Sequence, residues 1–252
     1  MNYIRPFAKI PMLENLPLYL TISFLLTTLA AVGMVVLLIR TTLKRLSIAS
    51  FLRIIIVTFV WLGIQGVISV SGVYSNHPSS IPPKIIVIGI FPALFAIVLI
   101  FITRKGKRFI DQLSMQMLTY IHLIRMPVEL VLYGLFIHGA VPELMTFEGR
   151  NLDILAGITA PLVGYFGISK NRMGKLSLLA WNVTCLVLLL NIVFHAVLST
   201  PSPFQQFGFD RPNVAILNFP FSWLPTFIVP LVLFAHLAAI RKLTIVKFVC
   251  DK

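Results

Sequence analysis

LPLYLTISFLLTTLAAVGMVVLLI, residues 16–39, is the stretch that decides the fold. It holds 24 residues without a charge, and about 20 apolar residues in a helix cross the hydrocarbon core of a bilayer. The stretch is too long for the core of a signal peptide, no small-residue cleavage site follows it, and Arg40 ends it. We therefore expect a retained transmembrane helix.

Six further apolar windows follow along the chain. They cover residues 48–74, 85–102, 113–139, 152–168, 176–198 and 219–240. Of the 252 residues, 58% are hydrophobic and 12% are charged, whereas a soluble domain is about a quarter charged. The mean hydropathy of +0.95 excludes a soluble enzyme and a disordered chain, and two cysteines are too few for a disulfide scaffold. The sequence predicts one all-α domain, residues 1–252, built as a bundle of seven transmembrane helices.

The basic residues alternate between the two sides of the predicted bundle. The segments after the first, third, fifth and seventh windows hold fourteen: Arg40, Lys44, Arg45, Arg104, Lys105, Lys107, Arg108, Lys170, Arg172, Lys175, Arg241, Lys242, Lys247 and Lys252. The N-terminus and the other loops hold five: Arg5, Lys9, Lys84, Arg150 and Arg211. Because cytoplasmic loops are enriched in Lys and Arg, we expect the N-terminus outside and the C-terminus in the cytoplasm. The net charge of +13 then indicates a lipid bilayer as the partner and no nucleic acid.

The window 113–139 is the most polar of the seven. His122, Arg125, Glu129 and Tyr133 fall within about 80° on a helical wheel and form one stripe. Arg125 and Glu129 are four residues apart, so we expect them to pair. Charges inside a membrane cost several kcal/mol and are candidates for function. Two interpretations stay open: a structural ion pair that locks the bundle, and a binding site or proton relay that faces its interior.

Two other windows carry weaker polar stripes. Gln65 lies in 48–74 with Thr58, Trp61 and Ser69, and Asn191 lies in 176–198 with Thr184 and His195. Such residues commonly hold helices together through hydrogen bonds of about 0.6 kcal/mol each. Three stripes in one bundle also fit a shared polar cavity.

The predicted outer loop before residue 154 is rich in charge. It brings Glu148, Arg150 and Asp153 close together where the fifth helix begins. Asn151 or Asp153 would be suited to cap that helix, where a carboxylate also gains from the helix dipole. The alternative is an outward-facing recognition or catalytic lip.

The histidines are candidate ligands for a metal ion or a haem. His138, His195 and Asp153 map to the predicted outer side, and zinc accepts three such ligands. No His-x3-His or His-Glu-x2-His pair occurs. A haem pair is disfavoured because His122 and His138 lie about 160° apart on the helix, and His122 and His236 differ in expected depth. We therefore expect no cofactor.

Three stretches resemble a family of uncharacterised bacterial inner-membrane proteins. They are MTFEGRNLDILAGITAP at 145–161, Trp181-Asn182 with LLN at 189–191, and Pro201-x-Pro-Phe leading to Phe221-x-Trp-Leu-Pro225. The resemblance covers roughly the C-terminal half of the chain. It implies a seven-helix protein of the bacterial inner membrane and assigns neither an activity nor catalytic residues.

These observations favour a non-enzymatic membrane protein that binds a small polar or amphipathic ligand in an interior polar cavity, for transport or sensing. In this hypothesis Arg125 holds an anionic group, while Glu129 or His122 changes its protonation. One alternative is a membrane-embedded, metal-dependent hydrolase with its site at the outer face, using His138, His195 and Asp153. The other is a scaffold subunit without a site of its own.

Overall fold

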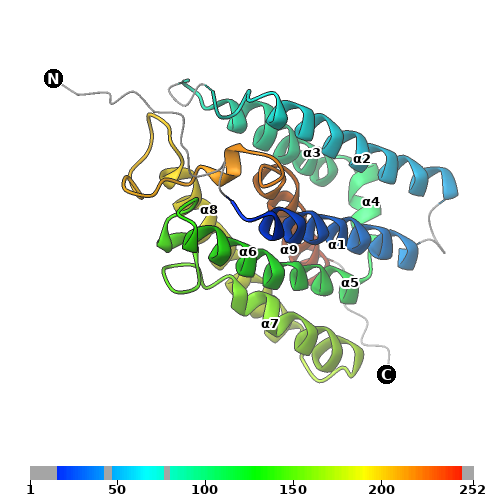
Figure 1. Cartoon of the computed structure of the whole chain (residues 1–252). Helices are drawn as coiled ribbons and strands as arrows, with labels where there is room; N and C mark the ends of the chain where they lie inside the picture. The colour runs from blue at the N-terminus through cyan, green and yellow to red at the C-terminus, as the bar shows by residue number, and fades with distance from the viewer. Residues whose placement is uncertain (1–15, 43–46, 77–79, 246–252) are drawn as a thin grey trace.

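The computed structural model describes residues 16–42, 47–76 and 80–245. Its elements are helices and turns, arranged as a bundle (Figure 1). Six basic residues that entered the prediction of orientation lie outside the described residues: Arg5, Lys9, Lys44, Arg45, Lys247 and Lys252. The predicted all-α class is confirmed.

Within the described ranges, six helical segments are long and apolar enough to cross a membrane. They are α1 (Leu18–Thr42), α2 (Ile48–Val70), η1 with α3 (Ile85–Ile90 and Phe91–Ile102), α5 with η2 and α6 (Met115–Tyr120, Ile121–Ile124 and Arg125–Ile137), α8 (Lys175–Ser199), and η6 with α9 (Leu224–Ile228 and Val229–Thr244). Each corresponds to one predicted window. The chain is therefore a multi-pass membrane protein by helix length and composition.

The remaining window, 152–168, gives a shorter helix. It consists of α7 (Ile154–Leu162) and a π-helical turn, η4 (Val163–Ser169). The 16 residues of Ile154–Ser169 rise about 24 Å, less than the roughly 30 Å of a hydrocarbon core. Helix length thus supports six spans and leaves the predicted seventh unconfirmed.

Short polar side chains fix where several helices begin. The hydroxyl of Ser47 accepts a hydrogen bond from the backbone N–H of Ser50 at the start of α2. Thr103 does the same for Gly106 at the start of α4 (Arg104–Gln112), a basic helix that follows α3. These caps satisfy N–H groups that have no partner inside the helix.

The bundle consists of a tightly packed part and a hairpin at its side. α1 packs on α6, α8 on α9, and α7 on α6 and η2. α2 and α3 lie next to each other at one edge (Figure 1). Two indoles tie this hairpin to η6: Trp61 Nε1 donates to the carbonyl of Thr226 at 2.9 Å, and Trp223 Nε1 donates to the carbonyl of Leu62 at 3.0 Å.

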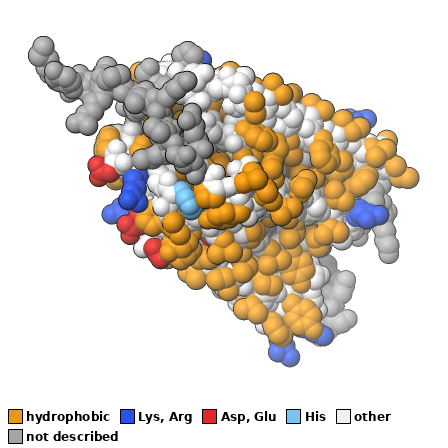
Figure 2. All heavy atoms as spheres, viewed as in Figure 1, with side chains coloured by type: hydrophobic (Ala, Val, Ile, Leu, Met, Phe, Trp, Pro, Cys, Tyr) orange, Lys and Arg blue, Asp and Glu red, His pale blue; other side chains and the backbone are white. Residues whose placement is uncertain are grey.

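Large apolar side chains cover the outside of the bundle. Val67 is 71% exposed and Leu176 is 78% exposed. On the face shown in Figure 2, hydrophobic side chains cover the middle while the Asp and Glu side chains gather at one end. An apolar surface of this extent suits contact with lipid and would be unfavourable in water.

Candidate functional site

Arg125, the first residue of α6, is buried in the bundle and 2% exposed. Its Nη1 lies 3.0 Å from Asp153 Oδ1 and also donates to the carbonyl oxygen of Cys185 at 3.3 Å. Its Nη2 lies 3.0 Å from Nε2 of His236. Three neighbouring helices therefore supply partners for one guanidinium group.

The predicted pairing of Arg125 with Glu129 is wrong. Among the described residues, the ion pair that Arg125 forms is with Asp153, the N-cap residue of α7. α7 approaches closely because Gly157 has no side chain: a Cβ there would lie 2.8 Å from Met126 Cγ and 3.3 Å from Arg125 Cβ. The carboxylate of Asp153, across this contact, therefore pairs with Arg125 in place of Glu129, which is four residues further along α6.

Glu129 is held by an amide instead of a cation. Nδ2 of Asn151 lies 2.6 Å and 2.7 Å from the two carboxyl oxygens, and 3.0 Å from the carbonyl oxygen of Met145. An amide nitrogen carries two hydrogens, so with one on Met145 the two oxygens of Glu129 share the other. A carboxylate has about four acceptor positions. Glu129 therefore keeps acceptor capacity that these protein bonds leave unused.

The amide oxygen of Asn151 orders the same corner. It accepts a hydrogen bond from the backbone N–H of Asp153 at 3.0 Å. Asn151 thus links the carboxylate of Glu129 to the backbone of Asp153, and its side chain fixes the start of α7. The side chain of Asp153 makes no capping hydrogen bond and is directed to Arg125. Of the two capping candidates, Asn151 is the one whose side chain bonds the backbone here.

His236 extends the network along α9. Because a guanidinium group only donates, Nε2 of His236 accepts from Arg125, and Nδ1 carries the proton that it donates to Oδ1 of Asn182 at 3.2 Å. His122 stacks on this ring with centroids 3.8 Å apart and an angle of 18°. The expected difference in depth between the two histidines is therefore wrong. Neither ring nitrogen of His122 has a hydrogen-bond partner among the described residues.

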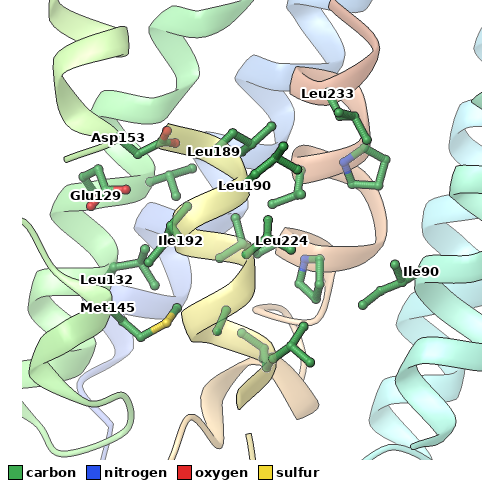
Figure 3. A pocket seen from close by; sticks show the side chains of 18 of the residues that line it. Ile90, Glu129, Leu132, Met145, Asp153, Leu189, Leu190, Ile192, Leu224 and Leu233 are labelled. Carbon is green, nitrogen blue, oxygen red and sulfur yellow. The ribbon is translucent and has the colours of Figure 1, made fainter. Parts of the chain in front are cut away.

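A groove of about 200 Å³ reaches the two carboxylates. It lies between α6, α8 and η6–α9, and η1 and α3 form its far side. Figure 3 shows Glu129 and Asp153 on one wall, Leu189, Leu190 and Leu224 along the groove, and Ile90 on the opposite side. The groove is thus mainly apolar, with its charge concentrated at one end, whereas the sequence predicts a polar cavity.

The groove opens sideways, toward the place of the lipid. Leu190 in α8 is 53% exposed and Leu94 in α3 is 37% exposed, and both line it. Leu190 lies in the interior of Lys175–Ser199, and Leu94 lies in the middle of the apolar segment Ile85–Ile102. A ligand could therefore enter from the bilayer at this depth, and not only from one end of the bundle.

The other predicted site residues lie elsewhere. Tyr133 donates to Oε1 of exposed Glu148 at 3.0 Å, and Nδ2 of Asn191 donates to the carbonyl oxygen of exposed Arg150 at 2.9 Å, so these four tie the loop 138–153 to α6 and α8. Gln65 accepts from Tyr74 and donates to the carbonyl oxygen of Ile88 at 3.3 Å. It therefore belongs to the contact between α2 and η1.

The three metal candidates do not form one group. Nδ1 of His138 bonds the carbonyl oxygen of Gly134, and Nδ1 of His195 bonds that of Asn191, each at 2.8 Å within its own helix. Asp153 is occupied by Arg125. In the part of the chain that the structure describes, no three His, Cys, Asp or Glu side chains are placed to hold a metal ion. The three residues of the hydrolase hypothesis are therefore not brought together as one set of ligands among the described residues.

Sequence reasoning missed three residues of the network: Asn151 as a ligand of Glu129, and His236 with Asn182. The sequence suggests a capping role for Asn151, and the charged residues around it give no indication of its bond to Glu129. His236 and Asn182 are polar residues inside apolar windows, which is itself a signal. Their partners lie on other helices, so spacing along one helix gives no indication of them.

The fold and the site define a multi-pass membrane protein with a buried network of charged and polar side chains. The chain belongs to a family described as a domain of unknown function (DUF8737), whose model matches residues 82–244. The matched segment includes Arg125, Glu129, Asn151, Asp153 and His236. No curated protein and no solved structure matches the chain.

Proposed function

We propose that the protein binds a small amphipathic ligand in the groove between α6, α8 and α9, in order to transport or sense it. The head group would be a cation or a hydrogen-bond donor placed against Glu129 and Asp153. One observation carries the proposal: an apolar groove ends at two buried carboxylates that have a single arginine near them.

The charges of the network support a cationic head group. Arg125 contributes one positive charge and is occupied by Asp153, Cys185 and His236. Glu129 is a second buried carboxyl group, and it receives a shared N–H only. Because an unpaired buried charge is costly, a bound cation would strongly stabilise the ionised form of Glu129. This revises the initial hypothesis, in which Arg125 holds an anion.

The size of the groove supports a short ligand. A cavity of about 150 Å³ lined by Leu, Ile and Phe holds one benzene molecule. A groove of about 200 Å³ therefore suits roughly six carbon atoms with a head group of one or two heavy atoms. Its apolar lining favours an alkyl or aromatic body, and the exposed Leu94 and Leu190 favour entry from the bilayer.

For the topology, we propose that Ile154–Ser169 is the seventh crossing, with the N-terminus outside, the C-terminus in the cytoplasm, and the chain in a bacterial inner membrane. The alternation of basic residues between successive loops supports this arrangement. A helix shorter than the bilayer core is accommodated by local thinning of the bilayer.

The test is a ligand series on protein purified in a non-ionic detergent. Hexylamine, hexanol and hexanoate share a six-carbon chain and differ in head-group charge. We expect hexylamine to raise the thermal unfolding temperature and hexanoate to leave it unchanged. A charge-assisted hydrogen bond contributes about 1.5–3 kcal/mol, so Glu129→Gln should weaken hexylamine binding about 10- to 100-fold.

Two variants make this result specific. Glu148→Gln removes an exposed carboxylate from the neighbouring loop and should bind hexylamine as the wild type does. Ala196→Phe fills the groove while Glu129 stays in place, and it should abolish binding. Equal effects of the three probes, or unchanged hexylamine binding in both Glu129→Gln and Ala196→Phe, would overturn the proposal.

A further inference from the structure

A second apolar cavity, of about 330 Å³, lies between α1, α2, α3 and another face of η6–α9. It extends from Trp61 and Thr226 to the end of the bundle where α1 ends and α4 begins. Three of its lining residues are direct neighbours of basic residues in the sequence: Ile39 of Arg40, Ile54 of Arg53, and Phe109 of Arg108. The apolar cavity therefore ends beside a concentration of positive charge.

Six basic side chains at this end are exposed: Arg40, Arg53, Arg104, Lys105, Lys107 and Arg108. Figure 2 shows Lys and Arg side chains at the end of the molecule where α1 ends. Of the carboxylates in residues 16–42, 47–76 and 80–245, the one at this end is Asp111, and Arg241 Nε lies 3.1 Å from it. The charge of the six is thus not balanced by the described carboxylates.

The basic residues at the start of α4 also favour a bound anion. Arg104 and Lys105 lie in its first turn, directly after the N-cap Thr103. A helix N-terminus carries a partial positive charge, so cations there are unfavourable by a few tenths of a kcal/mol or more. An anion at this end would offset both the helix dipole and the repulsion among the basic side chains.

We propose that this end of the bundle binds an anionic phospholipid. One acyl chain would occupy the cavity, and the phosphate would lie against Arg40, Arg53 and the basic side chains of α4. By comparison with the 150 Å³ that hold the six carbons of benzene, 330 Å³ hold about a dozen methylene groups. Val57 lines the cavity and is 61% exposed, so the chain can enter directly from the bilayer. Clusters of basic residues beside transmembrane helices recognise anionic head groups in this way.

Trp61 lines the cavity and reports its occupant directly. Bromine atoms on an acyl chain quench tryptophan fluorescence on contact. The protein is reconstituted into phosphatidylcholine vesicles that contain a small fraction of brominated phosphatidylglycerol or of brominated phosphatidylcholine. The signal of Trp61 is the difference between the wild type and Trp61→Phe. We expect brominated phosphatidylglycerol to quench it at a several-fold lower mole fraction than brominated phosphatidylcholine, and we expect high salt to reduce this preference.

The variant R40Q/R53Q/R108Q should remove the preference. The matched control K170Q/R172Q/K175Q removes three exposed basic residues, two between η4 and α8 and the third at the start of α8, and should keep it. Equal quenching of wild-type Trp61 by the two lipids would overturn the proposal, whether or not the variants fold. Loss of the preference in the control as well would show that the overall positive charge of the protein causes the preference. That result would also overturn the proposal.

Discussion

Replacing Asp153 by Asn removes the charge that balances Arg125 while it keeps the shape of the side chain. The two residues are 5% and 2% exposed and their nearest charged atoms are 3.0 Å apart. Breaking a buried ion pair leaves an uncompensated charge and costs about 3–5 kcal/mol. Because Arg125 keeps its hydrogen bonds to Cys185 and His236 in this variant, we expect a loss near the lower limit, about 3 kcal/mol.

Glu129→Gln is the matched comparison. Its carboxylate shares one N–H of Asn151 and forms no ion pair within the described residues. A Gln oxygen can accept that bond, so we expect the free energy of unfolding to change by less than about 1 kcal/mol.

Both free energies can be measured by titrating the protein in non-ionic micelles with dodecyl sulfate and following helix content. The double variant Arg125→Met with Asp153→Leu should recover much of the stability, since apolar residues often replace a buried ion pair without loss. A loss for Glu129→Gln as large as that for Asp153→Asn would refute this reasoning. It would indicate that Arg125 pairs along its own helix after all.

Two further predictions use the same titration. Gly157→Ala should lower the free energy of unfolding by about 1–3 kcal/mol, because the new methyl group would lie 3.0 Å from the backbone nitrogen of Met126. Gly63→Ala, with no atom within 4 Å of its Cβ, should raise it by about 0.5–1 kcal/mol, and equal effects would contradict the close packing of α7. His122→Phe should leave stability unchanged or higher, because neither ring nitrogen has a described partner. His236→Phe should lower the free energy of unfolding by about 1–3 kcal/mol, because Arg125 loses a hydrogen-bond acceptor. A larger loss for His122→Phe than for His236→Phe would show that His122 makes the more important contact.

The helices were predictable because the hydropathy of one continuous segment of sequence is enough to indicate each of them. The window 85–102 is reproduced as η1 with α3, and 113–139 differs by two residues at each end from Met115–Ile137. The limits of the prediction appear at 152–168, where an apolar helix exists but is short for a bilayer. Hydropathy reports which segments avoid water, and it does not report whether a segment of 16 residues crosses completely.

The depth of the histidines shows how a small error in a boundary alters a site. The window that ends at residue 240 places His236 four residues from its end, whereas His122 lies nine residues into 113–139. The structure continues α9 to Thr244, so His236 lies eight residues before that end and His122 lies seven residues after Met115. The two rings then reach the same depth and stack.

Helical spacing brought His122, Arg125 and Glu129 together, and the charged loop added Asp153. It did not identify the partner of each, because the partners come from α7, α8 and α9. Distance along one helix favoured Glu129 for Arg125, but the absence of a side chain at Gly157 decides the outcome by bringing α7 close. That contact depends on two segments at once and is invisible in either alone.

A cationic head group in the groove should lie at Glu129. An experimental structure of the protein saturated with hexylamine would show this contact. We predict that the amine nitrogen lies about 2.7–2.9 Å from a carboxyl oxygen of Glu129, with the alkyl chain between Leu189 and Leu233. An empty groove, or a ligand whose head group lies away from both Glu129 and Asp153, would contradict it.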